Sequence, residues 1–382
     1  MLTFNLVELT KTYYDWFPRC EAMNDIGVSV EKLDTPTLLV DLDLMDTNIA
    51  RMMKFLKSRR TKLRAHTKVH RIPFIAYKQL RAGAIGICCQ KVSEAQVMVA
   101  AGVKDVIVTN EIVTPQKIKR LVTLAKSAKV TVPVDNGSNA ELISRTATEA
   151  NVEVGVLVDV HMGSQRCGVE PGEPAVKLAR SISGLRGLRL EGLMGFEGHL
   201  SWIEPREKRR AEVEKIEAFL VQTKTLIENS GIHVGNISAG STGTYDVTTN
   251  NPEITELQAG TYVLMDGEYY KHVPEFECAL TVLATVISRP DDGRAITDAG
   301  LMSINTALGN PQVKKRDDLE VRELHAENTV LRTRSQSKVA IGDKIELIPS
   351  YLDATMNSHR QVYATRGGRV ESIWNTSRDT ST

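Results

Sequence analysis

The sequence predicts an α/β protein, with a TIM-like (β/α)8 barrel followed by a C-terminal β-rich domain. Short apolar strands alternate with helical segments about eight times over roughly 235 residues, which is typical of a closed parallel barrel. Helical periodicity stops near residue 275, where strands separated by turns begin. The length of 382 residues suits two domains. We expect the barrel at residues 33–272 and the β-rich domain at residues 1–32 and 273–382.

The barrel elements are predicted in order from residue 37. Residues 37–41 form an apolar opening strand, and residues 45–57 have the spacing of an amphipathic helix. Later strands are expected at residues 85–89, 105–109, 130–134, 154–160, 188–196, 234–239 and 257–261. Helices are expected between them at residues 91–101, 114–128, 137–150, 173–183 and 204–230. A doubly wound open sheet is the alternative, and the lack of a GxGxxG sequence after an early strand disfavours it.

The last third of the chain is predicted to be β-rich and without helical periodicity. Its strands are expected at residues 278–288, 294–298, 338–349 and 361–374, with turns at Asp291-Asp292-Gly293 and Arg366-Gly367-Gly368. Residues 1–32 are expected to join this domain. The polar tail at residues 375–382 is expected to fray.

Charge and cysteine content disfavour several function classes. The 48 basic residues nearly balance the 47 acidic ones, which gives no electrostatic case for binding nucleic acid or an anionic membrane. No apolar run is long enough for a membrane span, and the first residues lack the pattern of a signal peptide. The 5 cysteines are odd in number and lack CxxC spacing. We therefore expect reduced thiols, no structural zinc and a cytoplasmic protein.

The segment from Arg64 to His70 places Lys68 between two histidines. On an extended strand, residues two apart point to the same side, so His66, Lys68 and His70 are predicted to share one face. Two imidazoles and a partly desolvated pocket lower the pKa of an amine and suit Schiff-base chemistry. Solvated basic residues at a strand end are the alternative.

Polar or glycine-rich segments follow several of the predicted strands. Barrel active sites form at the C-terminal ends of the strands, so a shared position there indicates a shared site. Besides Lys68, the segments are residues 159–168, 195–199, 238–244 and 258–262. In residues 240–244, two glycines let the backbone approach an anion and three hydroxyls add donors, which suits phosphate. An ordinary turn between strand and helix is the alternative.

A lysine at one strand and a phosphate-binding turn at the far strands together predict pyridoxal 5′-phosphate (PLP) across the barrel mouth. The aldehyde would meet Lys68, and the phosphate would meet the turn at residues 240–244. Arg166 would donate to the ring nitrogen or to a substrate carboxylate. An arginine at that nitrogen leaves it unprotonated and weakens the electron sink.

With these residues, the chain resembles the alanine-racemase-like class of PLP enzymes over residues 33–375. Within that class it is similar to the group of D-threonine aldolases, 3-hydroxy-D-aspartate aldolases and D-serine dehydratases. The resemblance is carried by Leu33-Asp34-Thr35-Pro36, His66-Thr67-Lys68-Val69-His70, Gln90-Lys91-Val92-Ser93-Glu94-Ala95, Arg166-Cys167-Gly168-Val169, Gly240-Ser241-Thr242-Gly243-Thr244, Gly260-Thr261-Tyr262 with Met265-Asp266, and Asp298-Ala299-Gly300.

The resemblance implies a homodimer of barrel-plus-β-domain protomers that acts on a small amino-acid substrate. It implies Lys68 as the Schiff-base lysine and Asp298 at the domain junction. His199 is the candidate base near the substrate hydroxyl, with His70 and His359 as further candidates. The implied cofactor-binding residues, besides Lys68, are His66, Gln90, Arg166, Phe196, Ser241, Thr242, Gly243, Thr244, Gly260, Thr261 and Tyr262.

The chain departs from this group at the substrate side. The metal motif of the group has a histidine two residues before an aspartate or cysteine, whereas Tyr351 precedes Asp353 here. A neutral phenol is a poor ligand, so Asp353 alone would bind a divalent metal (Mn, Mg or Zn) weakly, and His359 is the candidate replacement ligand. Phe196 stands where the group often has tyrosine, and Met302 where it often has lysine.

Loss of the metal ligand affects dehydration more than aldol cleavage, because hydroxide is a poor leaving group without a Lewis acid. With the resemblance, this predicts a lyase that cleaves the Cα–Cβ bond of a D-3-hydroxy amino acid to glycine and an aldehyde. A dehydratase (ammonia-lyase) of D-serine or 3-hydroxyaspartate is the alternative. A racemase is less favoured, because it needs bases on both faces of the cofactor. A cofactor carrier, which would generally lack the β-rich domain, and a non-catalytic descendant stay open.

Overall fold

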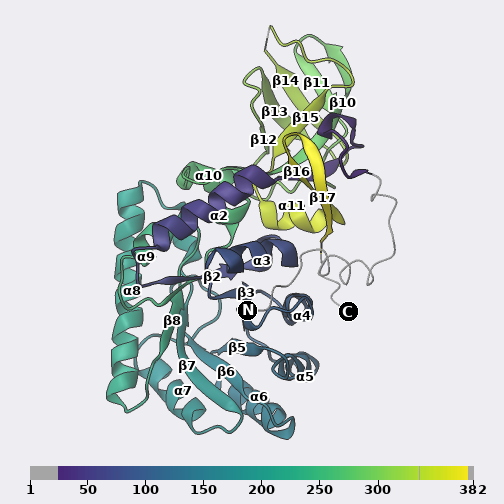
Figure 1. Cartoon of the computed structure of the whole chain (residues 1–382). Coiled ribbons are helices and arrows are strands. Elements are labelled where there is room, and N and C mark those ends of the chain that lie inside the picture. Colours follow the sequence, from purple (N-terminus) through teal and green to yellow (C-terminus); the bar gives the residue numbers. More distant parts are fainter. Residues whose placement is uncertain (1–24, 335, 377–382) are drawn as a thin grey trace. The chain divides into compact units, whose positions relative to one another are not determined.

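The computed structural model describes residues 25–334 and 336–376 of the chain (Figure 1). Contacts divide the described residues into two units. A β-rich unit contains residues up to 47 together with 263–270 and those from 277 on, and a barrel unit contains residues 48–262 and 271–276. The predicted barrel bounds, 33–272, differ from this division because residues 33–47 and 263–270 group with the β-rich unit.

Eight parallel strands close into a barrel, and the predicted fold class is confirmed. Most of the strands are apolar and buried on both faces, as expected of parallel strands that helices cover. The last strand pairs with the first and closes the barrel, with Leu63 opposite Leu257. The barrel strands are β2 (Lys62–His66), β3 (Gly86–Cys89), β4 (Asp105–Val108), β5 (Lys129–Val134), β6 (Val154–Asp159), β7 (Leu188–Gly195), β8 (Asn236–Ala239) and β9 (Glu256–Leu257).

Helices alternate with these strands and lie outside the barrel (Figure 1). Their apolar faces pack on the strands, with Ile143 and Val156 in the same core. Capping fixes where a helix begins: the Asn136 side chain accepts the N–H groups of Ser138 and Asn139 at 2.9 and 3.3 Å. The helices are α2 (Leu42–Leu56), α3 (Pro73–Ala82), α4 (Val92–Ala100), α5 (Pro115–Leu124), α6 (Gly137–Glu149), α7 (Glu173–Ser183), α8 (Arg206–Asn229) and α9 (Tyr245–Thr248).

The predicted opening strand belongs to the β-rich unit, so its expected place in the barrel is wrong. β1 (Thr37–Asp41) pairs antiparallel with β10 (Leu280–Asp291) and parallel with β16 (Gln361–Arg366). The first barrel strand is β2 instead. An apolar strand buried on both faces suits either sheet, so its composition does not indicate its partners.

The β-rich unit is built on a nine-stranded sheet of order β13-β14-β11-β10-β1-β16-β17, with β15 beside β10 and β12 beside β15. The strand predicted at residues 361–374 is the hairpin β16–β17, which turns at Gly367 and Gly368 with φ of +55° and +74°. Three further strands and a helix lie outside the predicted elements: β12 (Gln312–Val313), β13 (Leu319–Leu324), β14 (Thr329–Thr333) and α11 (Leu352–Ser358). The other strands are β11 (Arg294–Thr297), β15 (Lys344–Ile348) and β17 (Arg369–Asn375).

Residues 25–32 join this β-rich unit, as expected for that part of the N-terminal segment. The Gly27 and Val30 N–H groups donate to the carbonyls of Val370 and Gly368 at 2.8 and 3.0 Å. The expectations for residues 1–24 and for the tail beyond residue 376 lie outside the described residues.

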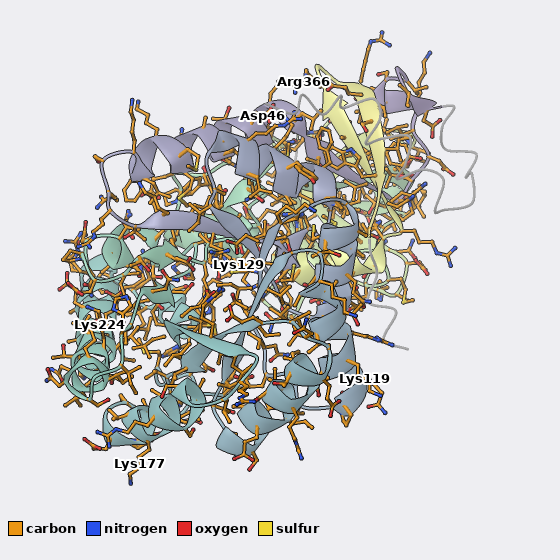
Figure 2. The ribbon with its side chains drawn as sticks, turned by 60° about the horizontal axis from the view of Figure 1, so that its bottom comes forward. Asp46, Lys119, Lys129, Lys177, Lys224 and Arg366 are labelled. Atoms are coloured by element: carbon orange, nitrogen blue, oxygen red, sulfur yellow. The ribbon has the colours of Figure 1, made fainter. Side chains whose placement is uncertain are left out.

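Charged side chains line the surface of both units (Figure 2). In the β-rich unit, Arg366 contacts Asp46 at 3.2 Å and Glu371 at 2.8 Å. In the barrel unit, Lys224 on α8 contacts Glu253 at 2.7 Å. Across the part of the chain that the structure describes, no helix combines the length and the apolar character needed to cross a membrane.

A charged layer lies inside the barrel near the N-terminal ends of its strands. Arg64 on β2 donates to both carboxylate oxygens of Glu256 on β9, at 2.9 and 2.8 Å, and to Asp105 on β4 at 2.7 Å. Arg64 and Glu256 are only 3 % and 4 % exposed. Gly86 on β3 leaves room for the guanidinium, because a Cβ there would overlap it. This layer therefore spans the β2–β9 seam that closes the barrel.

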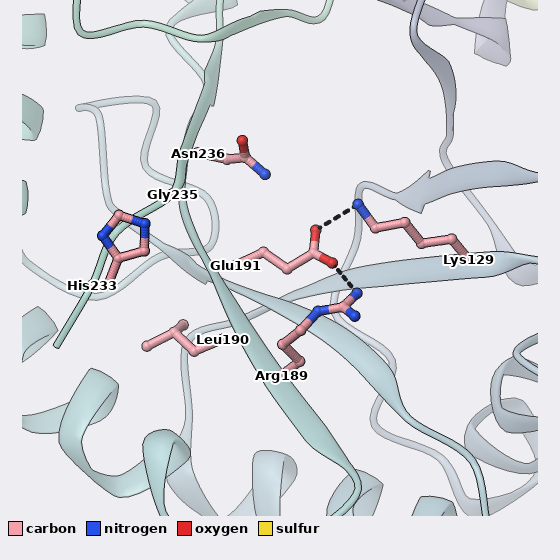
Figure 3. A pocket seen from close by; sticks show the side chains of 7 residues that line it. All are labelled: Lys129, Arg189, Leu190, Glu191, His233, Gly235 and Asn236. Atoms are coloured by element: carbon pink, nitrogen blue, oxygen red, sulfur yellow. Dashed lines mark hydrogen bonds and ion pairs between the residues drawn. The ribbon is translucent and has the colours of Figure 1, made fainter.

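A shallow pocket of about 560 Å³ opens at the same end of the barrel (Figure 3). Glu191 in its wall contacts Lys129 at 3.3 Å and Arg189 at 2.5 Å. These opposite charges already neutralise one another, and this end of a barrel commonly supports stability rather than catalysis. Its lining is Lys129, Arg189, Leu190, Glu191, His233, Gly235 and Asn236.

We predict that Glu256→Gln lowers the free energy of unfolding by on the order of 3 kcal/mol, because it leaves Arg64 buried without its main counter-charge. Glu153→Gln is the matched control: Glu153 contacts Arg189 at 2.8 Å, but its side chain is 54 % exposed. The control substitution should lower the free energy of unfolding by less than about 1 kcal/mol. Chemical unfolding of the full chain measures both, and equal losses would contradict the role given to the buried pair.

Candidate active site

The chain bends where β2 ends and places Lys68 at the barrel mouth. β2 stops at His66, and the 3₁₀ helix η3 (Thr67–Val69) follows at once. His66 Nδ1 accepts the Lys68 N–H at 3.2 Å and caps this turn. The prediction that His66, Lys68 and His70 share one face of an extended strand is therefore wrong. Lys68 still lies at the C-terminal end of a barrel strand, where barrels carry their catalytic groups.

The two histidines that flank Lys68 are uncharged at neutral pH. His70 is 0 % exposed, and its Nδ1 accepts the Ile72 N–H at 3.0 Å. Burial lowers the pKa of His70 to about 3. Burial, and then the charges of Lys68 and His70, lower the pKa of His66 to about 3. Neither ring can therefore act as an imidazolium acid, and His70 supports the turn from within the core.

Thr109, which the sequence analysis misses, joins two of the predicted cofactor residues. It follows β4, and its Oγ1 lies 3.0 Å from His66 Nε2. Its carbonyl accepts the Gln90 side-chain N–H at 3.3 Å. The structure thus brings His66 and Gln90 together at the ends of β2 and β3. Its place directly after a strand is the signal by which Thr109 could have been found.

The turn at residues 240–244 follows β8 and is closed by its own hydroxyls. Ser241, Thr242 and Thr244 are 4 %, 2 % and 0 % exposed. The Ser241 N–H donates to Thr244 Oγ1 at 3.0 Å, and the Gly243 N–H donates to Ser241 Oγ at 3.2 Å. A Cβ at Gly243 would overlap Ser201 in the 3₁₀ helix η4 (Gly198–Trp202), so only glycine fits there.

The loop after β9 packs between this turn and the end of β2. The Tyr262 N–H donates to Thr242 Oγ1 at 3.1 Å. A Cβ at Gly260 would overlap the His66 carbonyl, so the two strand ends approach closely. Tyr262 is itself fully buried, and Thr261 beside it is half-buried. The predicted residues after β2, β8 and β9 therefore gather at one side of the barrel mouth.

A second group of predicted residues gathers after β6 and β7. The Arg166 guanidinium lies over the ring of Phe196, 5.0 Å from its centroid, as in a cation–π contact. Burial, and then the charges of Arg166 and His161, lower the pKa of His199 below its ordinary value. The His199 Nδ1 is buried and has no hydrogen-bond partner among the described residues. His199 is therefore a neutral imidazole with an unused ring nitrogen at neutral pH.

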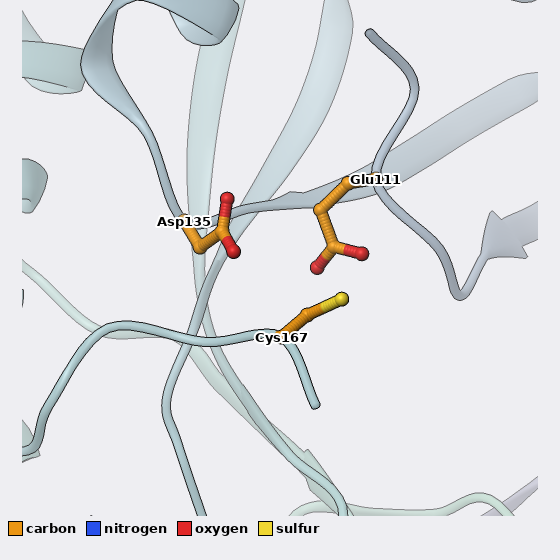
Figure 4. Close-up of side chains that lie close together, drawn as sticks. All are labelled: Glu111, Asp135 and Cys167. Atoms are coloured by element: carbon orange, nitrogen blue, oxygen red, sulfur yellow. The ribbon is translucent and has the colours of Figure 1, made fainter. Parts of the chain in front are cut away.

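A carboxyl cluster that the sequence analysis does not identify lies at the ends of β4, β5 and β6. Glu111, Asp135 and Cys167 place one potential ligand atom each within 4.8 Å of the others (Figure 4). Asp159 is 6 % exposed, and burial, then a hydrogen bond with Glu111, raises its pKa far above that of an ordinary carboxyl. Asp135 accepts the Gly168 N–H at 3.2 Å and so anchors the loop after β6.

The chemistry of this donor set is unfavourable for a metal ion. A hydrogen bond with Glu111, and then burial, raises the pKa of the Cys167 thiol to about 12. A thiol binds metal as its thiolate, so this sulfur is a poor ligand at neutral pH. The raised pKa of Asp159 likewise leaves that carboxyl group protonated and uncharged at neutral pH.

The altered metal motif lies at the start of α11 in the β-rich unit. Tyr351 immediately precedes the helix, and Asp353 is in its first turn. His359 follows the helix, and its Nε2 donates to the Ser303 carbonyl at 2.8 Å. Within the described residues of this unit, no three potential ligands come together. The motif therefore lacks the histidine ligand of the group and keeps Asp353 as its carboxylate.

The chain matches known families over both units. Residues 40–267 match the model described as the alanine racemase N-terminal domain, and residues 279–365 match the putative serine dehydratase domain. The chain is 36 % identical to D-threonine aldolase from Arthrobacter sp, across 91 % of this chain and 93 % of that protein. It is 32 % identical to 3-hydroxy-D-aspartate aldolase from Paracoccus denitrificans (strain Pd 1222), across 91 % of this chain and 92 % of that protein.

A solved structure supports the same relationship. The crystal structure of D-threonine aldolase from Filomicrobium marinum superposes with a TM-score of 0.89 at 34 % identity, covering 92 % of this chain and 97 % of that one. The fold and these matches together define the class: the chain belongs to the alanine-racemase-like family, as its motifs predicted. Within that family it is similar to aldolases of D-3-hydroxy amino acids along nearly its whole length.

Proposed function

We propose that this protein is a PLP-dependent lyase that cleaves the Cα–Cβ bond of a D-3-hydroxy amino acid to glycine and an aldehyde. One observation carries the proposal: a single barrel mouth holds Lys68 after β2, the 240–244 turn after β8 and the neutral His199 after β7. The similarity to D-threonine aldolase and 3-hydroxy-D-aspartate aldolase supports the same reaction.

The residues present fit this cofactor. Lys68 would hold the aldehyde carbon through a Schiff base, and Arg166 would face the ring nitrogen, with His66, Gln90 and Phe196 around the ring. The buried hydroxyls and the two glycines of the 240–244 turn would hold the phosphate, beside Gly260 and Thr261. When bound, PLP supplies an electron sink for the pair released at the substrate Cα.

His199 is the proposed general base. Its neutral ring accepts the proton of the substrate β-hydroxyl. The O–H electron pair then forms the aldehyde C=O as the Cα–Cβ bond breaks, and protonation of Cα completes glycine. Burial, and then the charge of Arg166, lower the pKa of His199 and keep its ring neutral, because a second positive charge beside the guanidinium is unfavourable.

Dehydration of D-serine or 3-hydroxyaspartate is the second candidate. The match of residues 279–365 to the putative serine dehydratase domain favours it. Against it, hydroxide leaves poorly without a Lewis acid, and Tyr351 replaces the histidine of the group's metal motif. The ring of His359 donates to a backbone carbonyl, and no group of three potential ligands among the described residues includes it.

We also infer a homodimer, as the resemblance to this class implies. Leu301 and Met302 follow β11 in the β-rich unit and are 47 % and 65 % exposed, so they offer apolar surface to a second copy.

We predict that Lys68→Ala abolishes covalent attachment of PLP that borohydride can trap, and abolishes glycine release from D-threonine. Lys62→Ala is the control, because Lys62 is exposed at the other end of the same strand. Mass spectrometry of the reduced protein and a glycine assay measure the two effects. Glycine release by Lys68→Ala at the wild-type rate would rule out the assignment.

We predict that His199→Asn lowers kcat by about 10²–10⁴-fold, the usual contribution of a general base. The base acts when neutral, and its pKa lies below the ordinary 6.5. In the wild type, kcat/KM should therefore fall only when the pH drops through a value below 6.5. The variant should not show this fall at low pH, the acidic limb of the pH profile. His233→Asn, at the opposite end of the barrel, is the control. An unchanged limb in His199→Asn would exclude His199 as the base.

A further inference from the structure

Glu197 is a fully buried acid in the segment that links Phe196 to His199. It is 0 % exposed and forms no ion pair among the described residues. Its carboxylate is instead surrounded by donors from the 240–244 turn and from α9. Oε2 accepts the Gly240 N–H at 3.1 Å, and Oε1 accepts the Thr244 hydroxyl at 2.6 Å and the Thr248 hydroxyl at 3.3 Å.

The donors that surround the Glu197 side chain suit a hydrogen-bond acceptor. Burial raises the pKa of Glu197, and the hydrogen bonds from Thr244 and Gly240 act in the opposite direction. A buried carboxylate without a cation is costly unless donors satisfy it. A glutamine would keep one acceptor oxygen and replace the other with an N–H₂ group. The three donors around the side chain therefore suit a group with two acceptor oxygens.

The bonds to Glu197 determine how the turn is closed. Because Thr244 gives its hydroxyl proton to Glu197, its oxygen is left to accept the Ser241 N–H at 3.0 Å. Thr244 Oγ1 also lies 3.1 Å from Ser241 Oγ, which accepts the Gly243 N–H at 3.2 Å. The backbone N–H groups can only donate, so the bond to Glu197 determines the direction of the remaining one: Thr244 Oγ1 is left as the acceptor toward Ser241 Oγ.

We propose that Glu197 is a positioning residue that holds the 240–244 turn in the shape that receives the phosphate of the cofactor. This inference rests on the proposed function, because that function supplies the phosphate ester. Glu197 itself has no surface to offer a ligand, so it acts through Gly240, Ser241 and Thr244. Loss of these hydrogen bonds should weaken the binding of a phosphorylated cofactor and spare contacts made elsewhere on the ring.

A comparison of two aldehydes separates this role from a general effect on folding. PLP and pyridoxal share the ring and the aldehyde, and only PLP carries phosphate. In the full chain stripped of cofactor, Glu197→Gln should weaken PLP affinity by about 10- to 100-fold, the effect expected when a buried hydrogen-bond network loses one partner. Pyridoxal affinity should stay within about threefold of the wild type. Absorbance titration measures both, and ³¹P NMR reports the bound phosphate directly.

Glu217→Gln is the matched control. Glu217 is 1 % exposed and also buried beside α9, where it accepts a hydrogen bond from Asn251 at 3.2 Å, but it does not bond to residues 240–244. Its substitution should leave the ratio of the two affinities unchanged. If Glu197→Gln does not fold, Thr248→Val removes a hydrogen bond to the same carboxyl group from α9, outside the turn, and should change the ratio in the same direction.

The possible results are distinct. Selective loss of PLP affinity supports the positioning role. Equal weakening of PLP and pyridoxal, or no weakening of either, overturns it while leaving the proposed function intact. A wild-type protein that binds PLP no more tightly than pyridoxal overturns the phosphate turn itself, and with it the proposed function.

Discussion

The parallel pairing of β2 with β9 is the constraint on which the candidate site depends. It closes the barrel, with Leu63 opposite Leu257. Because of this closure, the turn that carries Lys68 lies next to the loop that carries Gly260, where two backbones approach so closely that a Cβ would not fit. Arg64 and Glu256 bridge the same seam at the other end of the strands. One pairing therefore supports stability at one end and the site at the other.

Three buried acidic residues of the barrel are stabilised in three different ways. Glu256 is paired with Arg64, so a cation compensates its charge. Burial raises the pKa of Asp159 to about 9, so its carboxyl group is uncharged at neutral pH. Glu197 has neither and relies on hydroxyl and N–H donors. These are the general means by which a low-dielectric interior accepts an acid, and each leaves the acid in a different chemical state. The bonds that Glu197 accepts come from the neighbouring turn, so this acid can orient it.

The sequence predicted best what depends on local pattern. Strand–helix alternation predicted the barrel, and residues 173–183 form a helix with the predicted bounds. The sequence-based predictions were wrong where contacts between distant segments determine the structure. The strand Thr37–Asp41 is apolar enough for either sheet. Its pairing with β10 and β16 cannot be predicted from its own residues, because both partners are distant in the sequence. The bend at Thr67 depends on a cap from the His66 side chain. Glu111, Asp135 and Asp159 lie at the ends of three different strands, β4, β5 and β6, and the parallel pairing of these neighbouring strands brings them together.

The substrate side shows how a changed residue can keep part of its role. Phe196 lacks the hydroxyl of the tyrosine often found in this group, but its ring face still supports Arg166 at 5.0 Å. Tyr351 has no such compensation, since the described residues around it bring no set of three ligands together. Together, these differences favour cleavage by a neutral histidine base over metal-assisted loss of hydroxide.

The most direct test of this account is product analysis with D-threonine, D-3-hydroxyaspartate and D-serine, each with and without a chelator. The account predicts glycine and an aldehyde from a D-3-hydroxy amino acid, at a rate that the chelator does not change. Ammonia and a 2-oxo acid, lost on chelation, would contradict it and would show a metal-dependent dehydratase instead.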